Sequence, residues 1–140
     1  MFNKIVLAVD ESKYSELAAE AAIDLALKYN ADLTVISVVP LPMPSGTVGE
    51  VEEIKSEGER RLGMVLERVK QNAEKRELPV KTELLYGHVA ENIIRHVSNP
   101  KANLVVMGYK GSSAVKEFLL GSVSTKVLHH APCSVIVVRE

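Results

Sequence analysis

The chain has 140 residues, the usual length of one domain, so we expect residues 1–140 to form a single α/β domain without a second catalytic domain. Seventeen basic and eighteen acidic side chains leave a formal charge of −1, which argues against binding to nucleic acid or to an anionic membrane. No apolar run approaches the ~20 residues of a membrane span, and the lone cysteine, Cys133, cannot form an internal disulfide, so we expect a soluble cytoplasmic protein.

Composition and periodicity predict the fold class. Hydrophobic residues make up 46% of the chain but aromatic residues only 4%, so the core must consist of Val, Leu, Ile and Ala, as in a buried parallel sheet. Short apolar runs of strand length alternate with longer stretches in which apolar residues recur every three or four positions. This alternation is typical of βα units and predicts a doubly wound, five-stranded parallel sheet with helices on both faces.

The first βα unit is predicted near the start of the chain. Residues 5–9 form a continuous apolar run that predicts a buried strand ending before Asp10. Ser12 is a suitable N-cap for the following helix, and Asn30 tolerates the left-handed conformation in which helices end. This helix presents one apolar face, made of Leu17, Ala18, Ala21, Ala22, Leu25 and Ala26. After it, a second strand is expected at 33–39.

A loop and a long helix come next. The segment 40–49 contains three prolines and two glycines, which cannot extend a strand or a helix. From Glu50 to about Arg76, apolar residues at helical spacing predict a second helix, with Gly58 included in its apolar stripe. The other members of the stripe are Val51, Ile54, Leu62, Val65, Val69 and Ala73.

The rest of the chain predicts three more strands and two more helices. A turn at Gly87 opens the third helix, which Pro100 closes, and Pro132 ends the fourth. The strands are expected at 80–85, 104–107 and 134–138. Ile93, Ile94 and Val97 are expected to face inward on the third helix, and Val123, Val127 and Leu128 begin the fourth.

The carboxyl ends of the predicted strands mark the expected site. Ligands of open α/β sheets bind outside these ends, where Asp10, Val38 and Gly108 are expected to emerge. Three segments that are far apart in the sequence can therefore contribute to one site.

A glycine-rich stretch, GYKGSSAVKEFLLGSVSTKV, follows the fourth strand directly. We expect Gly108 and Gly111 to take positive φ and to turn amide N–H groups toward an anionic ligand, for which phosphate is the natural candidate. Gly121 and Ser122 stand at the start of the last helix, where free N–H groups favour a second phosphate contact.

This stretch matches neither the GxxxxGK[ST] phosphate loop nor the GxGxxG fingerprint. Glycines at strand-to-helix turns serve only the fold about half of the time. From these residues alone, phosphate binding and a purely structural role both remain open.

Four segments together resemble the universal stress protein family along essentially the whole chain. They are the pattern Gly108-x2-Gly111-x9-Gly121-Ser122, the opening KIVLAVDES, the turn GHVAENII and the ending APCSVIVVR. The resemblance implies a Rossmann-like sheet in the order 3-2-1-4-5, with the switch point between strands 1 and 4, and a homodimer. It also implies the ATP-binding branch of the family, which keeps these glycines.

The resemblance implies a role for each matched residue. Asp10 would lie near the ribose and phosphates, where a bridging Mg²⁺ would offset the repulsion between its carboxylate and a triphosphate. The structural alternative for Asp10 is a helix cap. The adenine pocket would be lined by Val38 and Val39, and the phosphates would be held by Gly108, Gly111, Gly121, Ser122 and Val123. The flanking residues Ala8, Val9, Met107 and Ser124 complete the expected cofactor-binding set.

Several other polar residues have a structural explanation that we favour. Lys110 could reach a phosphate, and His88 could touch the nucleotide, but an exposed loop lysine and a turn histidine are the commoner outcomes. His129 and His130 lie at a helix end, where they complement the helix dipole. Ser12 and Ser15 fit a helix start and have no recognisable base beside them, and Cys133 fits a buried structural thiol.

The fifth strand indicates a partner. In the strand order that the family implies, it lies at an edge of the sheet, where an uncovered apolar strand would invite aggregation. We expect a homodimer in which this strand pairs with its mate through Val135, Ile136, Val137 and Val138.

The family resemblance and the lack of visible catalytic residues favour an ATP-binding regulatory module of the stress response, with little or no hydrolysis. The alternatives are a slow Mg-dependent ATPase or phosphotransferase in which Asp10 holds the metal, and a dimeric scaffold without nucleotide. A two-component receiver domain does not fit, because Leu84, Leu85 and Tyr86 stand where its strand 3 aspartate belongs and no lysine follows strand 5 as required.

Overall fold

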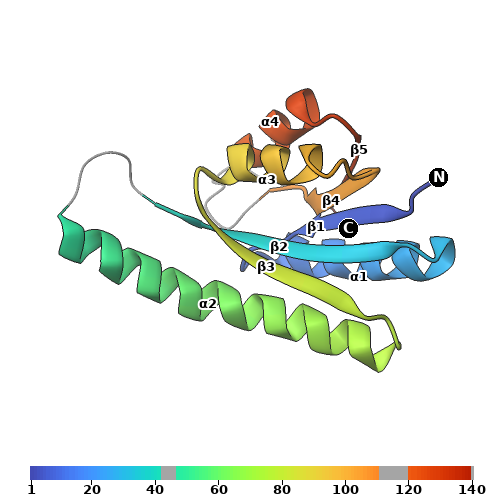
Figure 1. Ribbon diagram of the computed structural model, residues 1–140, viewed down its shortest axis with the longest axis horizontal. Helices are drawn as coiled ribbons and strands as arrows, with labels where there is room; N and C mark the ends of the chain where they lie inside the picture. Colours follow the sequence, from blue (N-terminus) through green and yellow to red (C-terminus); the bar gives the residue numbers. More distant parts are fainter. Residues whose placement is uncertain (42–46, 111–119, 140) are drawn as a thin grey trace.

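The computed structural model describes residues 1–41, 47–110 and 120–139. Within them, five parallel strands form one sheet in the order β3-β2-β1-β4-β5, with helices on both faces (Figure 1), which confirms the predicted class and strand order. In chain order the elements are β1 (Lys4–Ala8), α1 (Lys13–Tyr29), β2 (Asp32–Pro40), α2 (Val48–Lys75), β3 (Val80–Gly87), α3 (Val89–Ser98), β4 (Leu104–Gly108), α4 (Ser122–His130) and β5 (Ser134–Val138).

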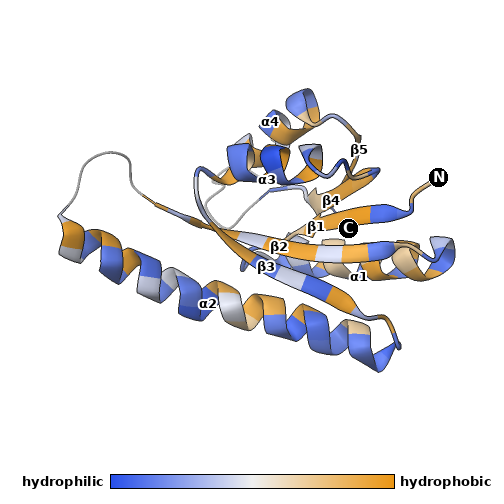
Figure 2. Ribbon diagram, in the orientation of Figure 1, coloured by the Kyte–Doolittle hydropathy of each residue, from blue (hydrophilic) through white to orange (hydrophobic). Residues whose placement is uncertain are grey.

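Each face of the sheet has its own apolar core. α1 and α2 cover one face, where they pack on residues such as Leu7 and Val106, and α3 and α4 cover the other, where they pack on residues such as Val6 and Val105. Because both faces are covered, successive residues of the central strands are buried, and these strands are largely orange in Figure 2. This double burial explains the continuous apolar runs in the sequence.

α1 begins and ends at the predicted residues. The Ser12 hydroxyl accepts a hydrogen bond from the Ser15 amide, and Asn30 closes the helix in the left-handed conformation with φ of 54°. The buried face differs from the prediction, because Ala19 and Ile23 are buried while Leu17 is only partly so. The reason is that α1 packs on the sheet and also lies beside α2, so its buried face is turned toward α2.

α2 begins at Val48, two positions before the expected start at Glu50. Thr47 and Glu50 form a capping box, in which each side chain accepts a hydrogen bond from the other residue's amide. Gly58 lies in the buried stripe, as predicted, because a Cβ at this position would come within 2.4 Å of Cγ1 of Val39. The glycine therefore lets α2 approach the end of β2 closely.

The two strands at the β3 edge run further than predicted. β2 extends to Pro40 and β3 to Gly87, because their parallel pairing continues to the register partners Pro40 and Gly87. Gly87 then turns the chain with φ of 116°, and α3 begins after His88. Among the described residues, none of the helices combines the length and the apolar character that crossing a membrane requires.

Candidate functional site

The boundary between β1 and β4 is the switch point of the sheet. β1 pairs with β2 on one side and with β4 on the other, and the helices that follow β1 and β4 cover opposite faces. At such a point the connections diverge and open a crevice beyond the carboxyl ends of the strands. β1 ends at Ala8 and β4 at Gly108, so the expected site residues of these two strands meet at this edge.

Asp10 is fixed in the turn between β1 and α1. Its Oδ1 accepts hydrogen bonds from the Ser12 amide at 2.8 Å and from the Ser15 hydroxyl at 2.9 Å, and its own amide donates to Ser15 Oγ at 2.8 Å. Ser12 is the N-cap of α1, so Asp10 supports the helix start without being the cap itself. Its half-buried carboxylate is thereby held at the carboxyl edge of β1.

Gly108 is required by packing. A Cβ at this position would lie 2.7 Å from Cβ of Tyr14 and 3.0 Å from its carbonyl carbon, so glycine lets the start of α1 approach the end of β4. The expected positive φ at Gly108 is wrong, since Gly87 is the glycine with positive φ in the part of the chain that is described. Gly111, where the same conformation was expected, lies outside the described residues.

Gly121 closes the glycine-rich stretch onto its own start. Its amide donates a hydrogen bond to the carbonyl of Tyr109 at 3.1 Å, and a Cβ there would lie 2.9 Å from Cα of Lys110. Gly121 is also the N-cap of α4, and among the described residues no side chain caps this helix start. The first-turn amides, beginning with Ser122, therefore remain suited to an anion.

The expected adenine-lining residues divide between the two faces of the sheet. Ala8, Val38 and Met107 pack together in the core under α3 and α4, whereas Val9 belongs to the core under α1 and α2. The side chain of Val39 packs against α2 at Gly58. Val38 and Val39 therefore do not line one surface with their side chains, because successive residues of a strand point to opposite faces.

The first turn of α4 places its three expected site residues differently. Ser122 is exposed, and Val123 is half-buried against the core under α3 and α4. Ser124 is buried, and its hydroxyl donates to the carbonyl of Gly108 at 2.8 Å. Ser124 thus joins α4 to the end of β4, and its hydroxyl already has a structural partner.

The lysine and histidines that the sequence offered as further candidates lie at different places in the fold. Lys110 is half-buried beside Gly121, and His88 is exposed at the N-cap of α3, where its side chain makes no capping hydrogen bond. His129 and His130 are exposed in the last turn of α4, as predicted.

Sequence reasoning missed two residues that shape the site. Tyr109 is buried, with its ring 5.9 Å from the Tyr14 ring and with the Arg139 guanidinium 4.5 Å from its centroid. Asn92 donates from Nδ2 to the carbonyls of Tyr86 and His88, which holds the turn before α3. A tyrosine directly after the glycine that ends a strand, and an asparagine in the first helical turn, were the available signals.

A groove of about 580 Å³ lies between α1 and α2 and touches the site at one end. Asp10, Ser12 and Ser15 line that end, and none of the described residues of the glycine-rich stretch does. Ion pairs connect α2 to α1 and to the turn before it: Arg68 pairs with Glu16 and Arg76 with Asp24 on α1, and Arg61 pairs with Glu11 in the turn. The groove is therefore a separate feature of the α1 and α2 face.

The described residues fit Mg²⁺ only as a companion of a bound phosphate compound. They contain no cluster of three or more His, Cys, Asp or Glu side chains that could hold a metal. Mg²⁺ usually takes one or two carboxylates and completes its octahedron with water and phosphate oxygens. The single carboxylate of Asp10 at the switch point suits this arrangement.

The sequence matches the Universal stress protein family over residues 1–139. Universal stress protein YxiE of Bacillus subtilis is 33% identical over 148 aligned positions, which cover 99% of this chain and 100% of that protein.

Solved structures agree with the fold. Universal stress protein UspA from Lactobacillus plantarum superimposes with a TM-score of 0.87 at 25% identity, covering 99% of this chain and 98% of that chain. A universal stress protein in complex with cAMP has a TM-score of 0.76 at 22% identity and covers 98% and 97% of the two chains. The Archaeoglobus fulgidus universal stress protein in complex with dAMP has a TM-score of 0.74 at 19% identity and covers 98% of both chains.

Proposed function

Because the chain belongs to the universal stress protein family, we propose that it binds an adenine nucleotide, in the first place ATP with Mg²⁺, at the switch point between β1 and β4. In this proposal a single cytoplasmic domain acts as a nucleotide-dependent regulatory module of the stress response. The observation that carries it is the contact between Gly121 and Tyr109, which brings an uncapped helix start to the end of β4. Two structures of the same fold are complexes with adenine nucleotides, cAMP and dAMP.

In this proposal, different residues contact the base and the phosphates of the nucleotide. The adenine base would lie against the apolar side that Ala8, Val38 and Met107 share, and Val39 would support this wall from the α2 side. The phosphates would meet the first-turn amides of α4, where the helix dipole favours negative charge. The remaining expected contacts are Val9, Gly108, Gly111, Val123 and Ser124, of which Gly108 and Ser124 act by holding α1, β4 and α4 together.

Asp10 would act at the ribose or at a metal ion that the nucleotide brings. Its hydrogen bonds to Ser12 and Ser15 fix the carboxylate before the ligand arrives, so little ordering is needed on binding. Bound Mg²⁺ would neutralise phosphate charge. Phosphoryl transfer also needs a charge clamp and a positioned nucleophile, for which Asp10 and Lys110 alone are the candidates among the described residues. We therefore propose little or no hydrolysis.

Dimerisation through β5 is part of the proposal. The two edges of the sheet differ, since β3 carries the exposed charges of Lys81 and Glu83, whereas Val135 to Val138 of β5 are uncharged and half-buried. Charged side chains protect an edge strand from pairing with other chains, whereas an uncharged edge strand needs to be covered by another segment or subunit. Sedimentation velocity at micromolar concentration is expected to give a dimer, and a monomer would refute this assignment.

The direct test is calorimetric titration of nucleotide-free protein with ATP, with and without Mg²⁺, and with dAMP and cAMP. Ser122→Ala removes an exposed hydroxyl at the helix start and is expected to weaken ATP binding by about threefold to tenfold. Ser134→Ala, an exposed serine at the start of β5, is the matched control and should leave binding unchanged. If the parent protein binds none of these nucleotides, the proposal fails.

One observation favours the scaffold alternative. Gly108 and Gly121 each occupy positions where a Cβ would collide with a neighbouring segment, so packing alone accounts for both glycines. A dimer in solution that binds no nucleotide in the same titration would support a scaffold without nucleotide.

A further inference from the structure

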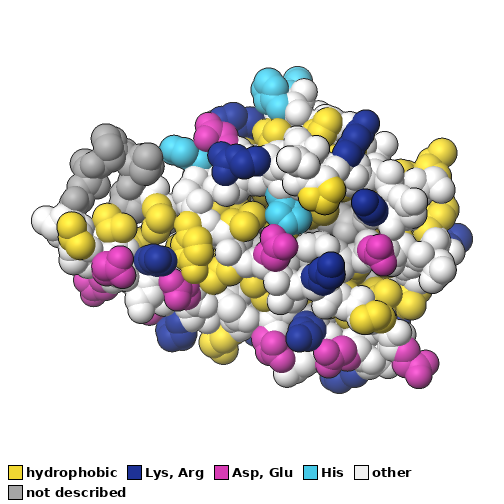
Figure 3. Space-filling view, viewed as in Figure 1, with side chains coloured by type: hydrophobic (Ala, Val, Ile, Leu, Met, Phe, Trp, Pro, Cys, Tyr) yellow, Lys and Arg dark blue, Asp and Glu magenta, His cyan; other side chains and the backbone are white. Residues whose placement is uncertain are grey.

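The first turns of α2 carry an apolar stripe that extends beyond the sheet. Further along the helix the stripe is buried at Gly58 and Leu62, but Val48 is 82% exposed and Ile54 is 42% exposed. Figure 1 shows these first turns projecting past the ends of β2 and β3, and hydrophobic side chains gather over them in Figure 3. The same amphipathic pattern that packs α2 on the sheet thus continues where the sheet does not cover it.

Tyr86 at the end of β3 extends this apolar surface. Tyr86 is 37% exposed, and its ring lies under the Lys55 ammonium, whose nitrogen is 5.1 Å from the ring centroid. This contact holds the ring against α2. Val48, Val51, Ile54 and Tyr86 form what we call the α2 overhang surface.

The charge around the overhang surface is negative. Residues 48–59 contain five glutamates and one lysine, a formal charge of −4. Glu57 pairs with Arg60 and Arg61 just beyond this range, so residues 48–61 carry a formal charge of −2 in a chain whose total is −1. Lys55 is the lysine that already lies over Tyr86. Glu52 and Glu53 are exposed on the flank of the stripe, so an incoming segment meets apolar side chains beside carboxylates.

The overhang is mechanically connected to the candidate nucleotide site at two points. Gly58 packs directly on Val39 near the end of β2, and Arg61 forms an ion pair with Glu11, which follows Asp10. Both contacts lie within two helical turns of Ile54. These two contacts join segments of the candidate site to α2 close to the overhang.

We propose that the α2 overhang surface docks a basic amphipathic helix of a partner protein. An exposed apolar stripe at helical spacing receives the apolar face of another helix, and the flanking glutamates select a basic one. The same negative charge disfavours anionic lipid and nucleic acid at this surface. A dependence of docking on nucleotide, transmitted through Val39 and Glu11, is the part of the inference that rests on the proposed function.

The probe is a fluorescently labelled, about 16-residue peptide of Leu and Lys with Leu at i, i+3, i+4 and i+7. Its control has the same composition with Leu and Lys alternating, which cannot form one apolar helical face. Fluorescence anisotropy is expected to show saturable binding of the helical peptide and at least about tenfold weaker binding of the control. Equal binding of the two peptides would overturn the proposal, because charge alone would then explain it.

Two pairs of variants test the surface itself. Val48→Ser with Ile54→Ser is expected to weaken binding at least about tenfold, whereas Met64→Ser, at a 57% exposed position of the same helix, leaves it unchanged. Glu52→Lys with Glu53→Lys is expected to weaken binding and reduce its salt dependence, and Glu74→Lys is the control near the end of α2. Circular dichroism checks that each variant is folded. Unchanged binding in the Val48 and Ile54 variant would refute docking at this surface.

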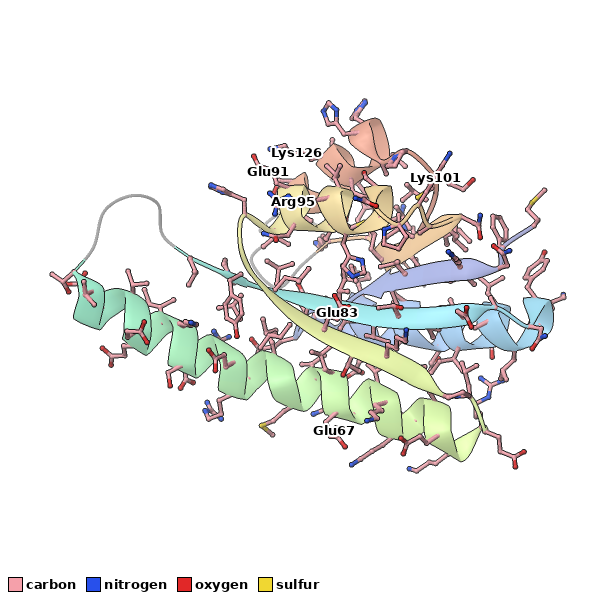
Figure 4. All side chains as sticks on the ribbon, in the orientation of Figure 1. Glu67, Glu83, Glu91, Arg95, Lys101 and Lys126 are labelled. Carbon is pink, nitrogen blue, oxygen red and sulfur yellow. The ribbon has the colours of Figure 1, made fainter. Side chains whose placement is uncertain are left out.

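A second copy of this chain is the competing occupant. Its cations for such a contact would be Arg95, Lys101 and Lys126, which Figure 4 labels on and beside α3 and α4, although Lys126 already pairs with Glu91 at 3.7 Å. Self-association that the Val48 and Ile54 changes abolish would assign the overhang surface to a second copy and overturn the partner proposal.

Nucleotide titration separates the two proposals. If the peptide binds and none of ATP, dAMP and cAMP does, the proposed function fails while docking stands. If both bind, each should change the affinity of the other by the same factor, because coupling between sites is reciprocal.

Discussion

The amide of Gly121 donates a hydrogen bond to the carbonyl of Tyr109 at 3.1 Å, so a stretch that leaves β4 returns to it before α4 begins. Two further contacts hold this closure: the Ser124 hydroxyl donates to the carbonyl of Gly108, and the Tyr109 amide donates to the carbonyl of Val138. The end of β4, the start of α4 and the end of β5 are therefore joined. A ligand at the helix start would bind to a framework that is already assembled.

Gly108→Ala is expected to destabilise the fold. The new methyl group would lie 2.7 Å from Cβ of Tyr14 and about as close to its backbone, so α1 must shift away from β4. We expect a loss of about 1–3 kcal/mol in the free energy of unfolding, the usual cost of overpacking. Urea denaturation followed by circular dichroism measures it.

The matched control for this change is Gly63→Ala. A Cβ at Gly63 has no neighbour within 4 Å, and this position lies inside α2. Alanine has the higher helix propensity, so the free energy of unfolding should rise by up to about 1 kcal/mol. If Gly108→Ala were as stable as the parent, the close approach between Gly108 and Tyr14 would not restrict the fold.

Gly58 and Val39 are expected to be energetically coupled. Gly58→Ala places a methyl group 2.4 Å from Cγ1 of Val39 and should cost about 1–3 kcal/mol. In a Val39→Ala background the colliding atom is absent, so the same change should cost much less. A double-mutant cycle from urea denaturation gives the coupling, for which we expect at least about 0.5 kcal/mol. Additive effects of the two changes would contradict this contact.

The helices and strands could be predicted from the sequence because the signals that define them lie close together along the chain. Ser12 and Asn30 bound α1 as predicted, and the apolar stripe of α2 includes Gly58, because capping and helical periodicity depend on neighbours in the chain. The start of α2 at Val48 could also have been found, since Thr47 and Glu50 have the capping-box spacing.

The site was less predictable because its packing depends on distant segments. Gly108 must be a glycine because Tyr14 of α1 packs against it, and nothing near Gly108 in the sequence indicates this contact. The strand order came from the family resemblance, since periodicity alone does not order the strands. The division of Val38 and Val39 between two faces follows from strand alternation and could have been predicted.

Cys133 is expected to react slowly with alkylating agents. Burial raises the pKa of its thiol, and Lys101 and a backbone hydrogen bond with Val105 oppose this effect only in part. Since the thiolate is the reactive form, the rate of reaction with iodoacetamide at neutral pH should be lower than in the denatured chain.

The pH dependence of Cys133 has a definite sign. A raised pKa in the folded state means that the fold favours the neutral thiol, so its contribution to stability is present below the pKa of the unfolded thiol and is lost as the pH rises through the folded pKa. The inflection of the alkylation rate should therefore lie at higher pH in the folded protein than in denaturant. An inflection at the same or lower pH would contradict the effect of burial on Cys133.

Asp10 is expected to have two separable roles, which two substitutions distinguish. Its Oδ1 accepts hydrogen bonds from Ser12 and Ser15, so Asp10→Ala should cost about 1–2 kcal/mol in the free energy of unfolding. Asp10→Asn keeps an oxygen acceptor and should retain most of this stability. It removes the negative charge, however, and in the proposed function it should weaken ATP binding in Mg²⁺ more than in the absence of the metal. Urea denaturation and calorimetry on the same samples measure both effects. Equal loss of stability in the two variants would mean that the charge of Asp10, and not its hydrogen bonds, holds the turn.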